Sequence, residues 1–207
     1  MKDLQTHWTH AWAALQLQPP TGLYEQLLRS YAEPQRHYHT LQHLQECLAL
    51  CSDVPGAVQH FGEVAVALWF HDAVYDVRGS DNEQRSADWA VQALQAAGAP
   101  ASVQARVHAL ILATRHDALP AAGDAQLLVD IDLAILGVSP ARFAEYAQQI
   151  RQEYAWVPEP VFLDKRQAIL QSFLDRAQIY STALFQARLE AQARRNLAEA
   201  LAALAVG

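Results

Sequence analysis

The chain has 207 residues, of which 52% are hydrophobic and 18% charged, and its formal net charge is −7. This length and apolar content allow one domain with a substantial core and exclude a disordered chain. The acidic balance argues against nucleic acid as a partner. No apolar stretch reaches the roughly 18–20 residues of a membrane span, since Glu63 interrupts the run from Phe61 to Phe70.

Ala, Leu and Gln dominate the sequence, and the alternating pattern of strands is missing, so we predict helices throughout. Expected helices, in chain order, cover residues 1–17, 21–31, 40–51, 57–71, 80–98, 102–114 and 124–136, with further helices beginning at 139, after 160 and at 181. The predicted architecture is a single compact all-α domain over residues 1–207.

Residues typical of helix ends support these boundaries. Thr21 is expected to cap the second helix, and Ser139 followed by Pro140 is expected to open the eighth. Ser80 and Glu83 have the spacing of a capping box. The helix over 57–71 is apolar on most sides and is therefore expected to be central.

His71 and Asp72 end this apolar helix. Burying an imidazole and a carboxylate is costly unless something pairs with them, and a divalent metal ion accepts both. Neighbouring side chains on a helix point about 100° apart, so both reach one ion only near a helix end. Residues 76–80 supply that end, because they cannot continue an apolar helix.

Two further polar clusters flank this pair along the chain. His39 and His43 are spaced i, i+4, so one ring can bind a metal while the other handles protons beside it. Asp130 and Asp132 are spaced i, i+2 in an apolar helix, so we expect only one of them to face the metal. The other is expected to bind an arginine or to orient a ligand histidine.

The two cysteines, Cys47 and Cys51, continue the helix face that begins at His43. A His-Cys-Cys zinc site is conceivable on this face, but structural zinc normally has four ligands. We therefore favour two small apolar residues on a buried face. The low cysteine count and the lack of a Lys/Arg-led apolar start favour a cytoplasmic protein with reduced thiols.

The order of these motifs, His, His-Asp and Asp, resembles that of the HD superfamily of metal-dependent phosphohydrolases, which have an all-α core. The resemblance covers residues 35–137, and the C-terminal helices over 139–205 are expected to pack on that core. Segments 36–43, 69–76, 82–87 and 130–133 also look like those of a bacterial group of predicted HD phosphohydrolases of this length.

The resemblance implies a metal centre and a hydrolytic reaction. It implies the metal ligands His43, His71, Asp72 and Asp132, and it makes His39 the general acid. Asp132 is preferred to Asp130 because the final Asp of the superfamily normally precedes Leu or Arg-Leu. The expected metal is Mn, Fe, Co, Ni, Zn or Mg, and the expected substrate is a phosphate ester of a nucleotide or a small phosphorylated metabolite.

Other polar residues are candidates for binding substrate or assisting water. Arg36 and Arg115 are expected to bind the phosphate group, because a guanidinium binds phosphate bidentately. His116 is assigned to the same task, with a second metal as its alternative role. Glu83 either completes the capping box or orients the attacking water, and Asp72 is also placed to accept a proton from that water.

Two other functions remain open at this stage. A diiron oxygenase of HD type would need His108 and His116 both to point into the site. A non-catalytic sensor would bind a nucleotide without turnover. The apolar C-terminal helix also makes a homodimer contact conceivable.

Overall fold

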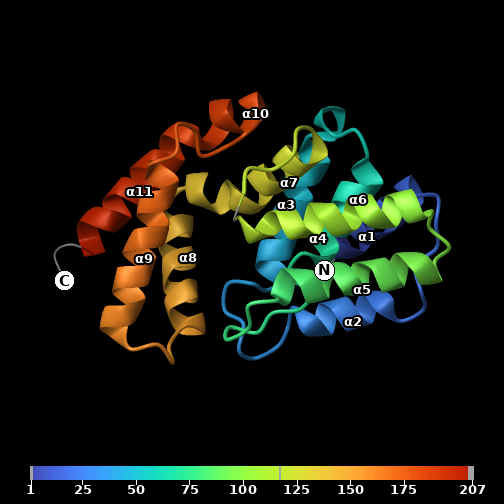
Figure 1. The fold of residues 1–207 in the computed structure, drawn as a ribbon, viewed down its shortest axis with the longest axis horizontal. Helices are drawn as coiled ribbons and strands as arrows, with labels where there is room; N and C mark the ends of the chain where they lie inside the picture. The colour runs from blue at the N-terminus through green and yellow to red at the C-terminus, as the bar shows by residue number, and fades with distance from the viewer. Residues whose placement is uncertain (1, 117, 205–207) are drawn as a thin grey trace. The chain divides into compact units, whose positions relative to one another are not determined.

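The computed structural model describes residues 2–116 and 118–204, and this part of the chain is helical with no strand. The predicted all-α fold is confirmed for these residues (Figure 1). The elements are α1 (Lys2–Ala14), α2 (Leu23–Ser30), α3 (Leu41–Asp53), η1 (Pro55–Ala57), α4 (Phe61–Phe70), α5 (Asn82–Ala96), α6 (Ala101–Leu112), η2 (Ala113–Arg115), α7 (Asp124–Asp132), η3 (Leu133–Gly137), α8 (Pro140–Glu153), α9 (Glu159–Leu174), α10 (Ala183–Phe185), η4 (Gln186–Glu190) and α11 (Ala191–Leu204).

The chain forms two compact units, Met1–Ile131 and Asp132–Gly207. Each has its own helix packing, and the expectation of one domain over residues 1–207 stays a prediction. No helix in the described residues has the length and apolar character needed to cross a membrane.

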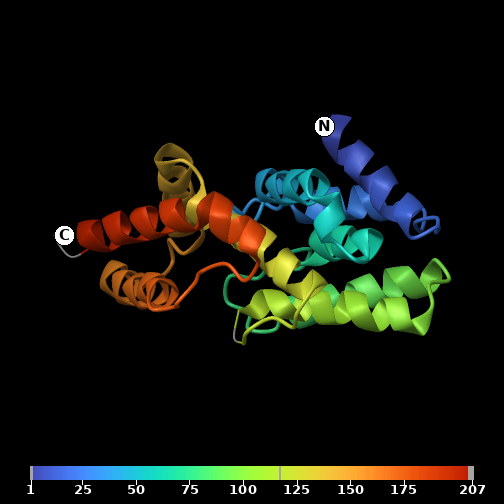
Figure 2. The same cartoon turned by 90° about the horizontal axis from the view of Figure 1, so that it is seen from above.

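Helix α4 is the centre of the first unit, where it packs against α1, α3, α5 and α6 (Figure 2). Its residues from Gly62 to Phe70 are all buried, as expected of a helix that is apolar on most sides. The one charged residue in the helix, Glu63, accepts two hydrogen bonds from the Arg106 guanidinium of α6, at 2.6 and 2.7 Å. Each buried large apolar side chain contributes about 1.5–3 kcal/mol, so α4 is held firmly and its end is a fixed point.

The start of α8 agrees with its sequence, whereas that of α2 does not. Ser139 accepts a hydrogen bond from the backbone N–H of Arg142, and Pro140 occupies the first helical position. The prediction that Thr21 caps the second helix is wrong. Gly22 takes the capping position with φ 78°, a left-handed conformation that costs glycine little.

The predicted capping box at Ser80 and Glu83 is also wrong. The residue that precedes α5 is Asp81, and its side chain makes no capping hydrogen bond. Asn82 instead accepts from the backbone N–H of Asp76 at 3.0 Å and donates to the Asp76 carbonyl at 2.9 Å. This amide bridge closes the loop between α4 and α5, which leaves Glu83 available for another partner.

In the second unit, a side chain of α11 is hydrogen-bonded to the backbone at the end of η3. Asn196 of α11 donates to the carbonyls of Leu136 and Val138, both at 2.9 Å. Gly137 is required here, because a Cβ at this position would lie 2.6 Å from the Cβ of Leu189. The expected helix over 124–136 is thus split, since it tightens from α7 to the 3-10 turn η3 directly after Asp132.

Candidate metal centre

The end of α4 fixes the orientation of the His71 ring. Phe70 is the last residue of the helix, and His71 continues it with helical φ and ψ. The Nδ1 of His71 lies 2.8 Å from the carbonyl oxygen of Leu68 and donates to it. This bond leaves Nε2 as the nitrogen with a lone pair, which is the arrangement that metal-binding histidines use.

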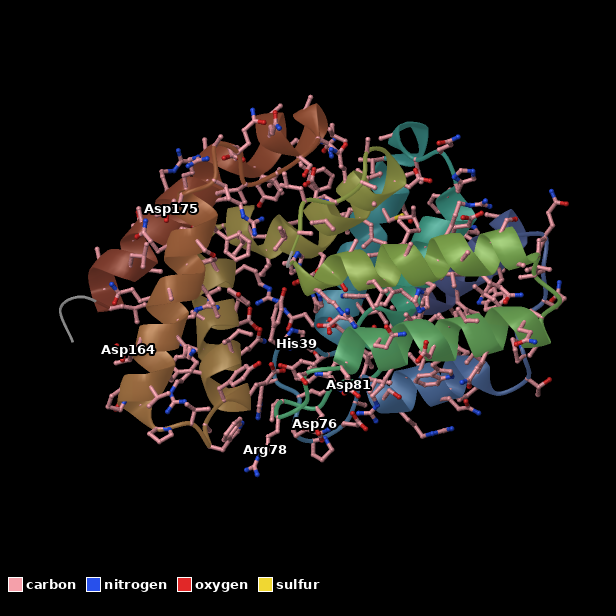
Figure 3. All side chains as sticks on the ribbon, in the orientation of Figure 1. His39, Asp76, Arg78, Asp81, Asp164 and Asp175 are labelled. Atoms are coloured by element: carbon pink, nitrogen blue, oxygen red, sulfur yellow. The ribbon has the colours of Figure 1, made fainter. Side chains whose placement is uncertain are left out.

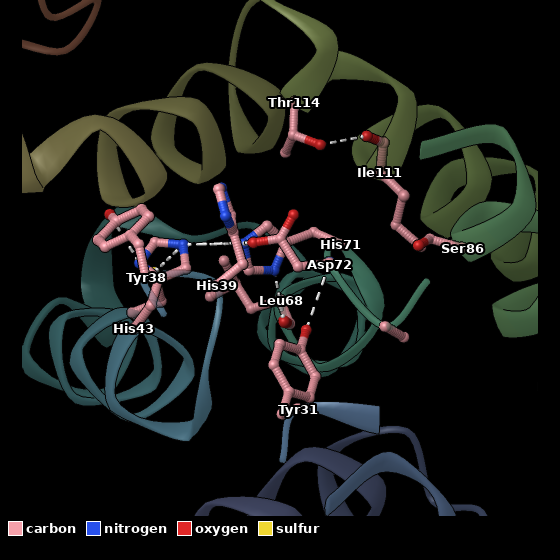
Figure 4. Close-up of polar contacts among 12 residues, drawn as sticks. Tyr31, Tyr38, His39, His43, Leu68, His71, Asp72, Ser86, Ile111 and Thr114 are labelled. Atoms are coloured by element: carbon pink, nitrogen blue, oxygen red, sulfur yellow. Dashed lines mark hydrogen bonds and ion pairs between the residues drawn. The ribbon is translucent and has the colours of Figure 1, made fainter. Parts of the chain in front are cut away.

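Helix α3 brings His43 to the same point. Thr40 caps this helix by accepting from the backbone N–H of Gln42, and His43 lies in its first turn. The hydroxyl of Tyr38 lies 3.0 Å from Nδ1 of His43, so the ring has a partner on that side as well. The Nε2 atoms of His43 and His71 therefore face each other at 3.2 Å (Figure 4).

The carboxylate of Asp72 lies close to the Nε2 atoms of both histidines. Its Oδ2 lies 3.0 Å from Nε2 of His71 and 3.5 Å from Nε2 of His43. Two donors that share one tetrahedral ion at bond lengths of about 2.0–2.2 Å stand roughly 3.3–3.5 Å apart. The two imidazoles and the carboxylate therefore have both the chemistry and the spacing to hold a divalent ion.

A wider set of donors surrounds the two histidines. Ligand atoms of His43, Cys47, His71 and Asp132 all lie within 4.8 Å of one another, and this group could hold a metal ion. The first three residues are buried and Asp132 is half-buried. Of the two aspartates at the end of α7, Asp132 belongs to this group, as expected, and Asp130 is buried.

The charge of the Asp72 carboxylate is favoured by its neighbours. Burial alone would raise the pKa of Asp72, but the rings of His71, His39 and His43 outweigh it and hold the pKa below its ordinary value. The Asp72 side chain is therefore a carboxylate, the form in which Asp binds a metal ion.

Arg36 lies under the site, where it binds the backbone. Its guanidinium donates to the carbonyls of Asp72 at 2.6 Å, Ala73 at 3.1 Å and His39 at 3.2 Å, and to the carboxylate of Glu33 at 3.0 Å. The residue is 5% exposed. These four bonds leave little of the guanidinium for the phosphate that the sequence suggested.

His39 lies beside the donor atoms. Its ring stacks on Tyr75, with centroids 4.1 Å apart and planes 28° apart, and Tyr38 contacts it edge-on. The ring centroid is 6.1 Å from that of His43. Figure 4 shows His39 beside Asp72, and Figure 3 shows His39 near the loop that carries Asp76, Arg78 and Asp81.

The remaining predicted residues lie on α5, α6 and η2. Glu83 and Arg115 lie opposite each other, with Oε2 and Nε 4.0 Å apart. His108 contacts Gln84 at 3.1 Å and Asp88 at 3.5 Å, both on α5. His116 has a left-handed backbone with φ 56° at the end of η2. Among the described residues, the group that could hold a metal ion includes neither His108 nor His116.

Three residues near the site were not assigned these roles from the sequence. Cys47 was interpreted as a buried apolar residue, although its i, i+4 spacing from His43 was the signal for a shared site. Tyr38 adjoins the predicted His39 and orients His43. Tyr31 donates to the carbonyl of Trp69 and accepts from the N–H of Asp72, and no local pattern marks it.

No family model, curated protein or solved structure matches this chain. The fold and the site by themselves define an all-helical protein with a His/Cys/His/Asp group that could hold a metal ion.

Proposed function

We propose that the protein is a metal-dependent phosphohydrolase of HD type, which cleaves a phosphate ester of a nucleotide or a small phosphorylated metabolite. The observation that carries this proposal is the convergence of His43, His71 and Asp72, with His39 beside them. A purely structural histidine pair would not need an anionic carboxylate and a further imidazole at the same point. We also propose that the protein acts in the cytoplasm.

The residues divide into those that hold the ion and those that act on the substrate. In this proposal His43, His71 and Asp132, which belong with Cys47 to the group that could hold a metal ion, bind the divalent ion. Asp72 lies outside that group but 3.0 Å from Nε2 of His71, and it is proposed as a further ligand. A bound divalent ion supplies a Lewis acid and makes water nucleophilic near neutral pH. The donor set, with two imidazoles, suits Mn, Fe, Co, Ni or Zn better than Mg.

His39 donates a proton to the leaving-group oxygen as the bond between that oxygen and phosphorus breaks. The stacking on Tyr75 holds the ring in place for this step, and a proton donor of this kind typically contributes ~10²–10⁴-fold to the rate. The carboxylate of Asp72 orients the attacking water. Arg115 and Glu83 face each other. In this proposal the substrate phosphate replaces Glu83 beside the Arg115 guanidinium, so that Arg115 binds the phosphate and Glu83 can orient the attacking water.

The test is elemental analysis of full-length protein purified without chelator, followed by a screen of phosphate esters with each metal. We expect about one ion per chain in the wild type and none in His71→Ala or Asp72→Asn. His108→Ala is the matched control, because His108 contacts Gln84 and Asp88 rather than the donor group. Circular dichroism establishes that each variant is folded.

Each outcome discriminates between functions. Turnover of a phosphate ester that requires the ion and is lost in His71→Ala supports the proposal. Two irons per chain, with one lost in His108→Ala, would replace it with the diiron oxygenase. Tight nucleotide binding without turnover under every metal would replace it with the sensor.

A further inference from the structure

Cys47 lies one helical turn after His43 on α3, and its side chain is buried against the group that could hold a metal ion. It is 2% exposed, and its sulfur lies 3.7 Å from Nδ1 and 3.8 Å from Nε2 of His43. The same sulfur lies within 4.8 Å of a ligand atom of His71. No other thiol in the described residues belongs to this group.

The second cysteine gives a direct contrast on the same helix. Cys51 lies one further turn along α3, is equally buried, and is outside the group. Burial, with a smaller effect from Asp124, raises the pKa of its thiol to about 12, so Cys51 keeps its proton. The two residues have the same chemistry and helix and nearly the same exposure, but only one is near the histidines.

The distances fit a sulfur donor. Sulfur and nitrogen atoms that bind one ion at about 2.3 and 2.0–2.1 Å stand roughly 3.5 Å apart where the angle between the two bonds is near 109°, close to the 3.8 Å observed here. Because the sulfur is almost equally far from both ring nitrogens, it lies beside the His43 ring.

We propose that Cys47 supplies a sulfur ligand to the metal centre, so that the site selects a thiophilic ion, Zn²⁺, Co²⁺ or Fe²⁺, over Mg²⁺ and Mn²⁺. As the metal–sulfur bond forms, the thiol proton passes to solvent. Thiolate favours the softer ions, whereas a site of imidazole and carboxylate alone accepts the harder ones more readily. This inference rests on the proposed metal centre and adds the class of metal to it.

The experiment uses Co²⁺ added to metal-free full-length protein. A sulfur ligand produces a charge-transfer band in the near ultraviolet, separate from the visible bands that any bound Co²⁺ gives. We expect this band in the wild type and in Cys51→Ser, and its loss in Cys47→Ser with the visible bands retained but shifted. Competition with a chelator should show at least about tenfold weaker Zn²⁺ binding in Cys47→Ser, a loss typical even of a residue that only supports a ligand.

The outcomes separate this inference from the proposed function. Visible Co²⁺ bands without a charge-transfer band in the wild type would overturn the sulfur ligand and leave the metal centre intact. Absence of Co²⁺ binding, with no difference between wild type and His71→Ala, would overturn both. If Cys47→Ser does not fold, Cys51→Ser still decides, because the chain has two cysteines and a band that persists in it belongs to Cys47.

Discussion

Replacing Arg36 with Met should destabilise the first unit by about 3–5 kcal/mol. The change removes the donors to the carbonyl of Ala73, in a buried bond, and to the carbonyls of His39 and Asp72, in part-buried bonds. A fully buried carbonyl left without a partner costs about 1–3 kcal/mol, and a part-buried one costs less. Removing the buried charge returns its desolvation cost, which offsets part of this sum. The expected loss is large beside the 5–15 kcal/mol that typically stabilises a protein.

Urea unfolding followed by tryptophan fluorescence measures this loss of stability in the first unit. The chain has five tryptophans, and all except Trp156 lie in the first unit. The measurement is made without metal, so that binding does not add to stability. Arg85→Met is the control, because its side chain is 53% exposed, and it should change the free energy of unfolding by less than about 0.5 kcal/mol. A loss below about 1 kcal/mol in Arg36→Met would refute the reasoning, since it would mean that the three carbonyls find other donors.

Three further outcomes are expected. His39→Ala should keep the bound metal, by elemental analysis, while losing ~10²-fold or more in the rate of ester hydrolysis, and loss of the metal would make His39 a ligand instead of the proton donor. Tyr31→Phe should lower the free energy of unfolding by about 1–2 kcal/mol in urea, because the hydroxyl that joins Trp69 to Asp72 is removed, and an unchanged midpoint would contradict this. Stability should fall between pH 9 and 12, because the raised pKa of Cys51 means that its thiol ionises first in the unfolded chain, and this slope should be weaker in Cys51→Ala.

The sequence predicts the helices better than it predicts their ends. The segment 61–70 is apolar except for Gly62 and Glu63, which favours a buried helix, and α4 is central as expected. The residues expected to cap the helices were less reliable guides. Thr21 and Ser80 are residue types that favour the cap position, but each lies one residue before the residue that occupies it. Asn82 explains the second case, because its two bonds to Asp76 hold the loop so that Asp81, one position after Ser80, precedes α5.

The candidate site was predictable where its residues lie close together in sequence. His71 and Asp72 were identified by the cost of burying them, and His39 and His43 by their spacing. The contacts of Arg36 could not be predicted, because its hydrogen bond to the Asp72 carbonyl spans 36 positions. Its expected role in binding phosphate stays a prediction. Cys47 shows the opposite difficulty, since its local spacing was visible but apolar burial explained it equally well.

The side chains that accept or donate hydrogen bonds at the C-terminal end of α4 also orient the candidate metal ligands. The last carbonyls of a helix lack partners within it, and here Nδ1 of His71 binds Leu68 and the hydroxyl of Tyr31 binds Trp69. Arg36 then binds the carbonyls of Asp72 and Ala73, where a cation is favoured by the helix dipole. Each of these bonds satisfies a buried or part-buried carbonyl, and each also fixes a ring or backbone that faces the candidate site. Stability and site geometry should therefore change together in variants of Tyr31 and Arg36, whereas His39, which binds none of the α4 carbonyls, can be replaced with little effect on stability.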